Sequence, residues 1–240
     1  MSDNIIEVQE EEVVAATPTK SKDIVEQLKN FWDNNSKNLL IGSGAIVAVI
    51  VGWIGYTELI QKPNEEKAAD AIFKAQQYFA QDSSRKVLDG DANSKGVLYV
   101  INKFGGTKAA NLAHFYAGIS YLKLGDFKKS VEHLKDFSTD AKQVQMVAYG
   151  ALADAYAEQG NKEEAVGYYK KAGSTFESDE ANSAEYLFRA GLLNETLNKP
   201  KDALEIYKEI KAKYPKTDKG AQIDKYIYRL SNEKSELSVN

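Results

Sequence analysis

The longest apolar run in the chain extends from Leu39 to Thr57, and its 19 residues (LLIGSGAIVAVIVGWIGYT) include no charged side chain. A helix rises 1.5 Å per residue, so this run would be about 28 Å long, close to the ~30 Å hydrocarbon core of a bilayer. The pattern predicts a single transmembrane helix over residues 39–60. A buried core helix is disfavoured by the length of the run. A cleavable signal peptide is disfavoured because 38 residues precede the run.

The segment before this run is also patterned. Ile24, Leu28, Phe31 and Trp32 fall at helical spacing, which predicts an amphipathic juxtamembrane helix over residues 21–38. Its apolar face would lie along the membrane surface or against a partner, and the pattern leaves both open. Residues 1–20 are acidic and are expected to be disordered. Within the apolar run, a stripe of small residues could allow helix pairing in a homodimer, and it consists of Gly44, Ala48 and Gly52.

After the apolar run, hydrophobic positions recur at helical spacing. Pro63 opens one predicted helix, residues Gln81–Asn93 are predicted to form a loop, and a further helix ends at Gly105. Three later segments can be aligned with one another: AHFYAGISYLKLGDFKKSVEHLKDF, AYGALADAYAEQGNKEEAVGYYKKA and EYLFRAGLLNETLNKPKDALEIYKEI. Each contains two predicted helices joined by a short turn.

Aligned positions in the three segments have mechanical explanations. Small residues would let the two helices of a hairpin approach closely, at Gly118, Ala153 and Gly191 in the first helices and at Ser130, Ala165 and Ala203 in the second helices. Gly125 and Gly160 would permit a left-handed turn, and Asn198, which replaces glycine in the third segment, tolerates the same conformation.

A helix–turn–helix unit that repeats about every 34 residues is typical of tetratricopeptide repeats. The expected fold is therefore all-α, with the transmembrane helix followed by an α-solenoid of such hairpins over residues 63–231. The amphipathic segment DKGAQIDKYIYRL is expected to form the C-terminal capping helix. Residues 232–240 are expected to be disordered.

The composition narrows the range of functions. The net charge of −4 arises within residues 1–38, and the rest of the chain is neutral, so it offers no basic surface for nucleic acid. The absence of cysteine excludes thiolate chemistry. No phosphate-binding loop, nucleophile elbow or HExxH motif occurs. The two histidines, His114 and His133, are interpreted as structural, with His133 facing outward. We therefore expect no catalysis, cofactor or metal.

Stacked helix hairpins expose one face of their first helices, which usually lines a groove. Asp154 and Glu158 lie one helical turn apart on such a face. A segment with basic and apolar side chains, extended or helical, would suit this groove. The predicted partner-binding groove consists of Phe115, Ile119, Lys123, Asp154, Glu158, Phe188, Leu192 and Glu195.

Three parts of the chain together resemble the YfgM-like family of ancillary SecYEG translocon subunits: IVEQLKNFWDNNSKN, GWIGY and the repeats with their closing YIYRL helix. The resemblance covers most of residues 22–230, and the acidic first twenty residues are an addition to the family pattern. It implies a single-pass protein of the bacterial inner (plasma) membrane with a cytoplasmic N-terminus and a periplasmic domain. Its partners would be translocon subunits, chaperones or nascent secreted chains. The alternative is a scaffold for envelope assembly or cell division.

Overall fold

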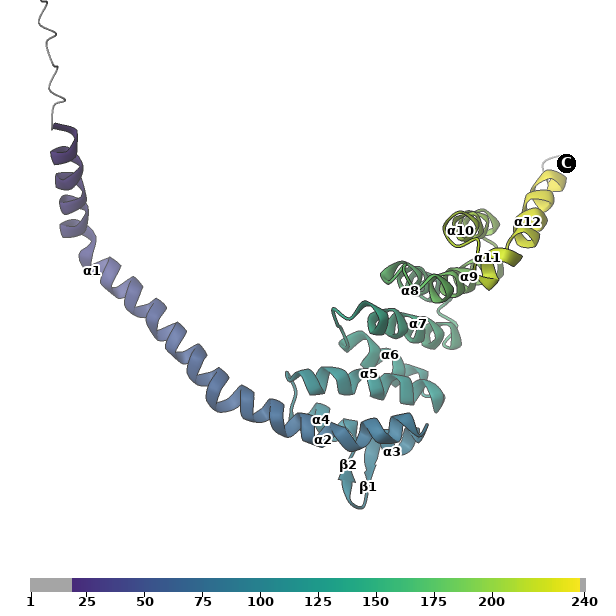
Figure 1. Ribbon diagram of the computed structural model, residues 1–240, viewed down its shortest axis with the longest axis horizontal. Coiled ribbons are helices and arrows are strands. Elements are labelled where there is room, and N and C mark those ends of the chain that lie inside the picture. The colour runs from purple at the N-terminus through teal and green to yellow at the C-terminus, as the bar shows by residue number, and fades with distance from the viewer. Residues whose placement is uncertain (1–18, 238–240) are drawn as a thin grey trace, which may run out of the picture. The chain divides into compact units, whose positions relative to one another are not determined.

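The computed structural model describes residues 19–237. The tail expected at residues 1–20 therefore lies almost wholly outside the described residues, as do residues 238–240 of the expected C-terminal tail. The chain divides into two compact units, Met1–Leu59 and Ile60–Asn240. Figure 1 labels helices and strands of both units along the ribbon.

The first unit is dominated by one helix, α1 (Thr19–Tyr56). The segments expected as a juxtamembrane helix and a transmembrane helix thus belong to the same helix. A short π-helical segment, η1 (Thr57–Gln61), follows directly. Within the described residues there is one helical stretch long and apolar enough to cross a membrane, judged by length and composition.

The second unit is a stack of helices that follows chain order from α2 to α12 (Figure 1). The three aligned segments form the hairpins α5/α6, α7/α8 and α9/α10, which confirms the predicted helical solenoid. The elements are α2 (Lys62–Ala80), α3 (Ser84–Asp89), β1 (Gly90–Asp91), β2 (Ser94–Lys95), α4 (Val97–Lys103), α5 (Lys108–Lys123), α6 (Phe127–Asp136), α7 (Lys142–Glu158), α8 (Lys162–Thr175), α9 (Glu180–Thr196), α10 (Pro200–Lys213), α11 (Asp218–Gln222) and α12 (Asp224–Leu237).

The connection between α2 and α4 is more ordered than the expected loop. It contains α3 and an antiparallel pairing of β1 with β2. The Asp91 carboxylate accepts hydrogen bonds from the Tyr78 hydroxyl, the Ser94 hydroxyl and the Asn93 backbone N–H. These bonds, led by that from Tyr78, lower the pKa of Asp91 to about 2. The loop prediction failed here because Tyr78, which fixes the turn, lies on α2, outside the segment.

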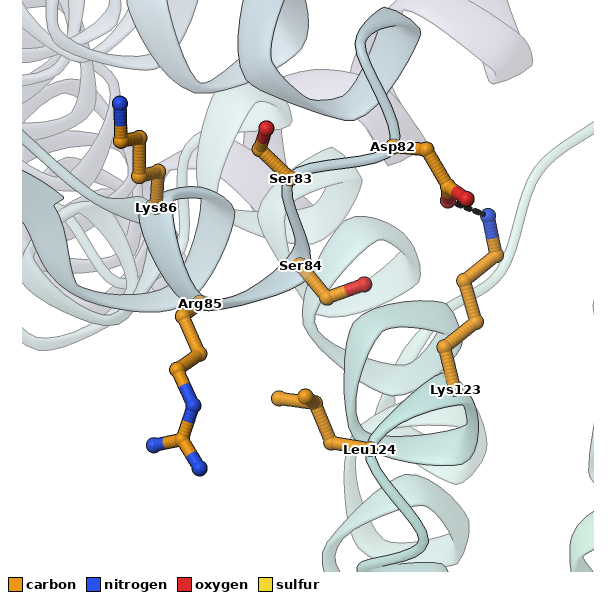
Figure 2. Close-up of a pocket in the computed structure, with 7 residues that line it drawn as sticks. All are labelled: Asp82, Ser83, Ser84, Arg85, Lys86, Lys123 and Leu124. Carbon is orange, nitrogen blue, oxygen red and sulfur yellow. Dashed lines mark hydrogen bonds and ion pairs between the residues drawn. The ribbon is translucent and has the colours of Figure 1, made fainter.

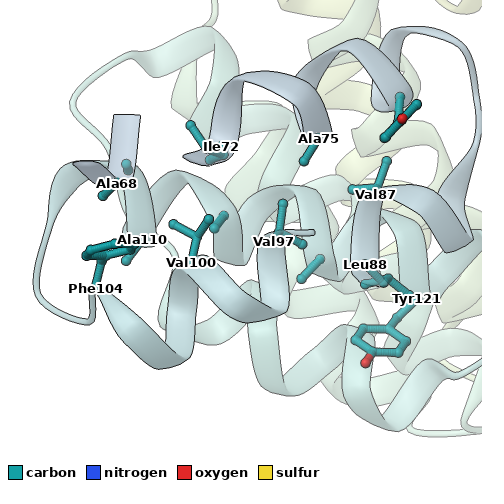
Figure 3. Close-up of a cluster of buried hydrophobic side chains, with 14 residues drawn as sticks. Ala68, Ile72, Ala75, Val87, Leu88, Val97, Val100, Phe104, Ala110 and Tyr121 are labelled. Carbon is teal, nitrogen blue, oxygen red and sulfur yellow. The ribbon is translucent and has the colours of Figure 1, made fainter. Parts of the chain in front are cut away.

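A core of mostly small and branched side chains joins α2, α3, α4 and α5 (Figure 3). Ala68, Ile72 and Ala75 of α2 are buried against Val97 and Val100 of α4. The small side chains of Ala68 and Ala75 let the axes of these helices approach closely. This core connects the first part of the second unit to the three hairpins.

The small residues predicted to allow close helix packing do so. A Cβ at Gly118 would lie 2.4 Å from Cγ of Leu134 on the partner helix, and a Cβ at Gly191 would lie 2.2 Å from the ring of Tyr207. The turn residues also adopt the expected left-handed conformation, with φ of 78° at Gly125 and 56° at Asn198.

The C-terminal helices close the stack, as predicted. Phe188 of α9 packs against Tyr226 of α12 with ring centroids 5.0 Å apart, and Ile223 and Leu230 are buried in the same cluster. Arg229 of α12 pairs with Glu195 of α9 at 2.8 Å. The last helix reaches Leu237, so residues 232–237, expected as a disordered tail, continue α12.

Replacing Gly191 with alanine tests the close packing. We expect Gly191→Ala to lower the free energy of unfolding by about 1–3 kcal/mol, because the fully buried Tyr207 ring cannot move aside. The matched control is Gly167→Ala on α8, where a Cβ meets nothing within 4 Å. This change should raise stability by up to about 1 kcal/mol through helix propensity. Urea unfolding of the detergent-solubilised chain measures both. Equal effects would contradict this account of the packing.

Candidate protein-binding surface

Each first helix of the three hairpins has one side that does not pack on its own second helix. Exposed and half-buried side chains on that side recur at spacings of three or four residues, which places them on one face. We call this surface the first-helix face. Its members are Leu112, Tyr116, Ile119 and Lys123 on α5, Val147, Asp154 and Glu158 on α7, and Glu185, Arg189 and Leu192 on α9.

The part of this face nearest α2 is mainly apolar. A hollow of about 530 Å³ lies between α2 and α5. Its apolar lining includes Ala69 and Ile72 on α2 and Leu112 on α5, and its polar lining consists of Glu65, Glu66, Gln76 and Lys108. The ring of Phe79 lies 4.7 Å from that of Tyr116, measured between centroids. Phe73 lies one turn beyond Ala69 and is 60% exposed. This end of the face therefore offers apolar contact area to a ligand.

The part formed by α7 and α9 carries a chain of alternating charges. Arg189 lies 3.1 Å from Asp154 and 2.8 Å from Glu185, and Lys219 of α11 lies 3.1 Å from Glu185. The hydroxyl of Tyr169 also donates to Asp154. Burial first, and then this hydrogen bond, raise the pKa of Tyr169. Asp154 is thus neutralised by its neighbours within the protein.

Glu158 differs from Asp154 although it lies one turn away on the same helix. Its side chain is exposed, and it makes no hydrogen bond or ion pair within the part of the chain that the structure describes. Leu192, 39% exposed, offers an apolar contact on the neighbouring helix α9. A ligand on this face would therefore meet an available carboxylate together with apolar side chains.

The residues of the predicted lining differ in exposure. Lys123, Glu158 and Leu192 are exposed, whereas Ile119 and Asp154 are half-buried. Phe115 and Phe188 are only 9% and 7% exposed, and both pack in the core. Their partner rings are Phe137 at 5.2 Å and Tyr226 at 5.0 Å.

Glu195 and Lys123 also have partners within the protein. Glu195 accepts a hydrogen bond from the Tyr207 hydroxyl at 2.6 Å and pairs with Arg229, so it holds the capping helix. Lys123 pairs with Asp82. This exposed pair can open to a ligand at little cost because surface ion pairs are weak.

Several surface residues were missed by the sequence reasoning. Leu112 and Val147 lie seven residues before Ile119 and Asp154, so helical periodicity could have found them. Arg189 could not be found in this way, because its role depends on the contact between α7 and α9.

Comparisons with known proteins agree with this architecture. A family model described as "Tetratricopeptide repeat-like domain" matches residues 29–222. A crystal structure of nearly identical TPR-like repeats of a kinesin light chain from Podosopora anserina is similar in fold, with a TM-score of 0.51 and 12% identity over 71% of this chain and 87% of that chain. The chain has no significant match among curated proteins.

A second hollow, of about 610 Å³, lies where α2, α3 and the end of α5 meet (Figure 2). It includes three basic side chains, from Arg85, Lys86 and Lys123. Figure 2 shows that these side chains do not converge: Arg85 and Lys86 point in different directions, and Lys123 reaches Asp82. The hollow therefore lacks the geometry of an anion site.

The two histidines meet, although they are nineteen residues apart in sequence. The Nδ1 atoms of His114 on α5 and His133 on α6 lie 3.1 Å apart, and His133 stacks on Tyr121 with ring centroids 5.4 Å apart. His133 is thus half-buried, which corrects the expectation that it faces outward. Within residues 19–237, no cluster of three potential ligand residues could hold a metal ion.

This histidine pair should make the stability depend on pH. Burial lowers the pKa of both imidazoles below 6.5, and proximity to His114 lowers that of His133 further, against the opposing charges of Glu132 and Asp136. The unfolded chain therefore binds more protons between the folded-state pKa values and 6.5, so the free energy of unfolding should fall as the pH drops through that window. Urea unfolding at a series of pH values measures this slope. A slope unchanged in the double variant His114→Gln/His133→Gln would contradict it.

Proposed function

This chain belongs to the tetratricopeptide repeat-like domain family, and on that premise we propose that it is a membrane-anchored adaptor that binds other proteins through its first-helix face. Repeat domains of this kind are typically scaffolds that bind proteins and catalyse no reaction. The observation that carries the proposal is the juxtaposition on one face of exposed apolar side chains with the available carboxylate of Glu158.

The ligand suited to this face is a polypeptide segment, extended or helical, with apolar and basic side chains. Leu112, Ile119, Val147 and Leu192 would take its apolar positions, because these side chains lose exposed area on contact. Glu158 would take a basic position. Asp154 would contribute by fixing Arg189, which keeps α7 and α9 in register for the ligand.

In this proposal, helix α1 anchors the protein in the membrane. Its apolar run matches the thickness of a bilayer, and its large apolar side chains are exposed. The resemblance to the YfgM-like family supports a cytoplasmic N-terminus and a domain in the periplasm. The lysines within about twenty residues of the run agree, since four lie on its N-terminal side and three (Lys62, Lys67 and Lys74) on its C-terminal side. A homodimer through Gly44, Ala48 and Gly52 also remains part of the proposal, supported by the sequence stripe.

The finer proposal is an ancillary factor of the secretory translocon that links it to periplasmic chaperones. It rests on the resemblance of residues 22–230 to that family. The alternative is a scaffold for envelope assembly or cell division. The identity of the proteins that contact the first-helix face distinguishes the two.

Photocrosslinking in intact membranes tests the face and identifies the partner. A photoreactive amino acid at position 147 or 192 should crosslink to a discrete set of proteins, because both side chains lie on the proposed binding face. The matched controls are Lys170 on α8 and Lys208 on α10, both exposed on second helices. Glu158→Lys should reduce crosslinking from position 192 several-fold.

The outcomes separate the proposals. Translocon subunits or chaperones would support the finer proposal, and cell-wall or division proteins would support the alternative. Equal crosslinking from positions 170 and 208 would reject the first-helix face as the binding surface.

Membrane fractionation tests the anchor. The full chain should stay in the membrane pellet after alkaline carbonate extraction, because a helix that spans the bilayer is not released by high pH. In spheroplasts, added protease should digest the second unit if that unit faces the periplasm. Release by carbonate would contradict the anchor, and protection from protease would contradict the orientation.

A further inference from the structure

The helix α1 is longer than a bilayer requires. Its 38 residues correspond to about 57 Å, whereas the hydrocarbon core is ~30 Å thick. If the apolar run from Leu39 spans the membrane, as proposed above, then the first twenty residues of the helix lie outside the hydrocarbon core.

This outer part of α1 is not polar on all sides. Five large apolar side chains are between 55% and 64% exposed, and they cluster on one side of the helix: Ile24, Val25, Leu28, Phe31 and Trp32. We call this the juxtamembrane face. The opposite side carries polar and charged residues, including Asn30 and Asp33. Exposing the face to water would cost about 25 cal/mol for each Å² of apolar surface.

The chain separates this segment from the apolar run by Asn34–Asn38, a stretch of polar residues with low helix propensity. The Asn35 side chain donates a hydrogen bond to the carbonyl of Phe31 at 2.9 Å, and side-chain bonds of this kind often bend helices. In Figure 1 the first, darkest part of α1 runs in a different direction from the rest of the helix. The juxtamembrane face can therefore turn away from the direction of the span.

We propose that residues 24–32 form an interfacial helix, whose juxtamembrane face lies in the headgroup layer of the same bilayer that α1 crosses. The lipid surface is the occupant because the face is continuous with the span and begins only a few residues from it. Aromatic residues at one end of the face, Phe31 and Trp32, are the type that settles at this depth. Lys29 borders the face and can extend to phosphate groups. Binding is driven by apolar burial, since the charges on the polar side nearly balance.

The protein offers an internal reporter for this inference. Its two tryptophans are Trp32 and Trp53, so Trp53→Phe leaves a single tryptophan, on the juxtamembrane face, which can be excited selectively over tyrosine. The full chain is reconstituted in phosphatidylcholine vesicles that carry bromine at shallow or at deep acyl positions. Shallow bromine should quench Trp32 several-fold more than deep bromine, and aqueous acrylamide should quench it weakly. The quenching of Trp32 by bromine should not depend on the protein-to-lipid ratio.

Two results would overturn the inference. Strong quenching by acrylamide without quenching by bromine would place Trp32 in water. Bromine quenching that weakens as the protein-to-lipid ratio rises would show that a second copy covers the face.

Matched variants separate this inference from the proposed function. In the single-tryptophan chain, Leu28→Glu should weaken the quenching of Trp32 by bromine and strengthen its quenching by acrylamide. Asn30→Glu, on the opposite side of the helix, should leave both unchanged. Both changes lie outside the folded second unit and leave the apolar run intact. Carbonate resistance and crosslinking from position 192 should therefore persist in both variants. If Leu28→Glu leaves Trp32 in the headgroup layer, the juxtamembrane face does not hold the segment there.

Discussion

Close approach between two helices of a hairpin is the constraint on which the second unit depends. A helix hairpin cannot bury its apolar side alone, so it must pack on a neighbour, and the packing distance is set where side chains are smallest. Gly191 against Tyr207 and Gly118 against Leu134 are such points. The alanines that fill the cores between hairpins follow the same rule. The apolar sides of the hairpins are buried in this packing, and the first-helix face, the binding surface proposed above, lies outside it.

Local features of the fold could be predicted from sequence, and long-range ones could not. The left-handed turns at Gly125 and Asn198 depend on single residues, so the repeat alignment located them correctly. The burial of Phe188 depends on Tyr226, which lies in a helix after the last hairpin. The contact between the two histidines likewise depends on how α6 packs on α5. In both cases the sequence placed the residue on a helix correctly, but it did not identify the group that covers the side chain.

The same limit applies to the charges on the first-helix face. Spacing along α7 makes Asp154 and Glu158 equivalent, because they lie one turn apart. The structure distinguishes them, because Arg189 forms an ion pair with Asp154 and Tyr169 donates a hydrogen bond to it. Glu158 stays available to a ligand. A charged residue on this surface can thus be held in an ion pair within the protein, as Asp154 is, and is then not available to a ligand. Helix α1 differs in this respect, because its large apolar side chains, such as Phe31 and Trp53, are exposed within the part of the chain that the structure describes. Lipid is the environment that suits such side chains.

The capping helices also limit how this architecture can grow. Tyr226 and Leu230 occupy the side of α9/α10 on which a further hairpin would pack. A second array could therefore not pack on this side of the last hairpin without displacing these two side chains. Gene duplication could lengthen the array by inserting a hairpin before α9, where each neighbour offers an equivalent packing side. An insertion after α10 would instead have to displace Tyr226 and Leu230 from this packing side.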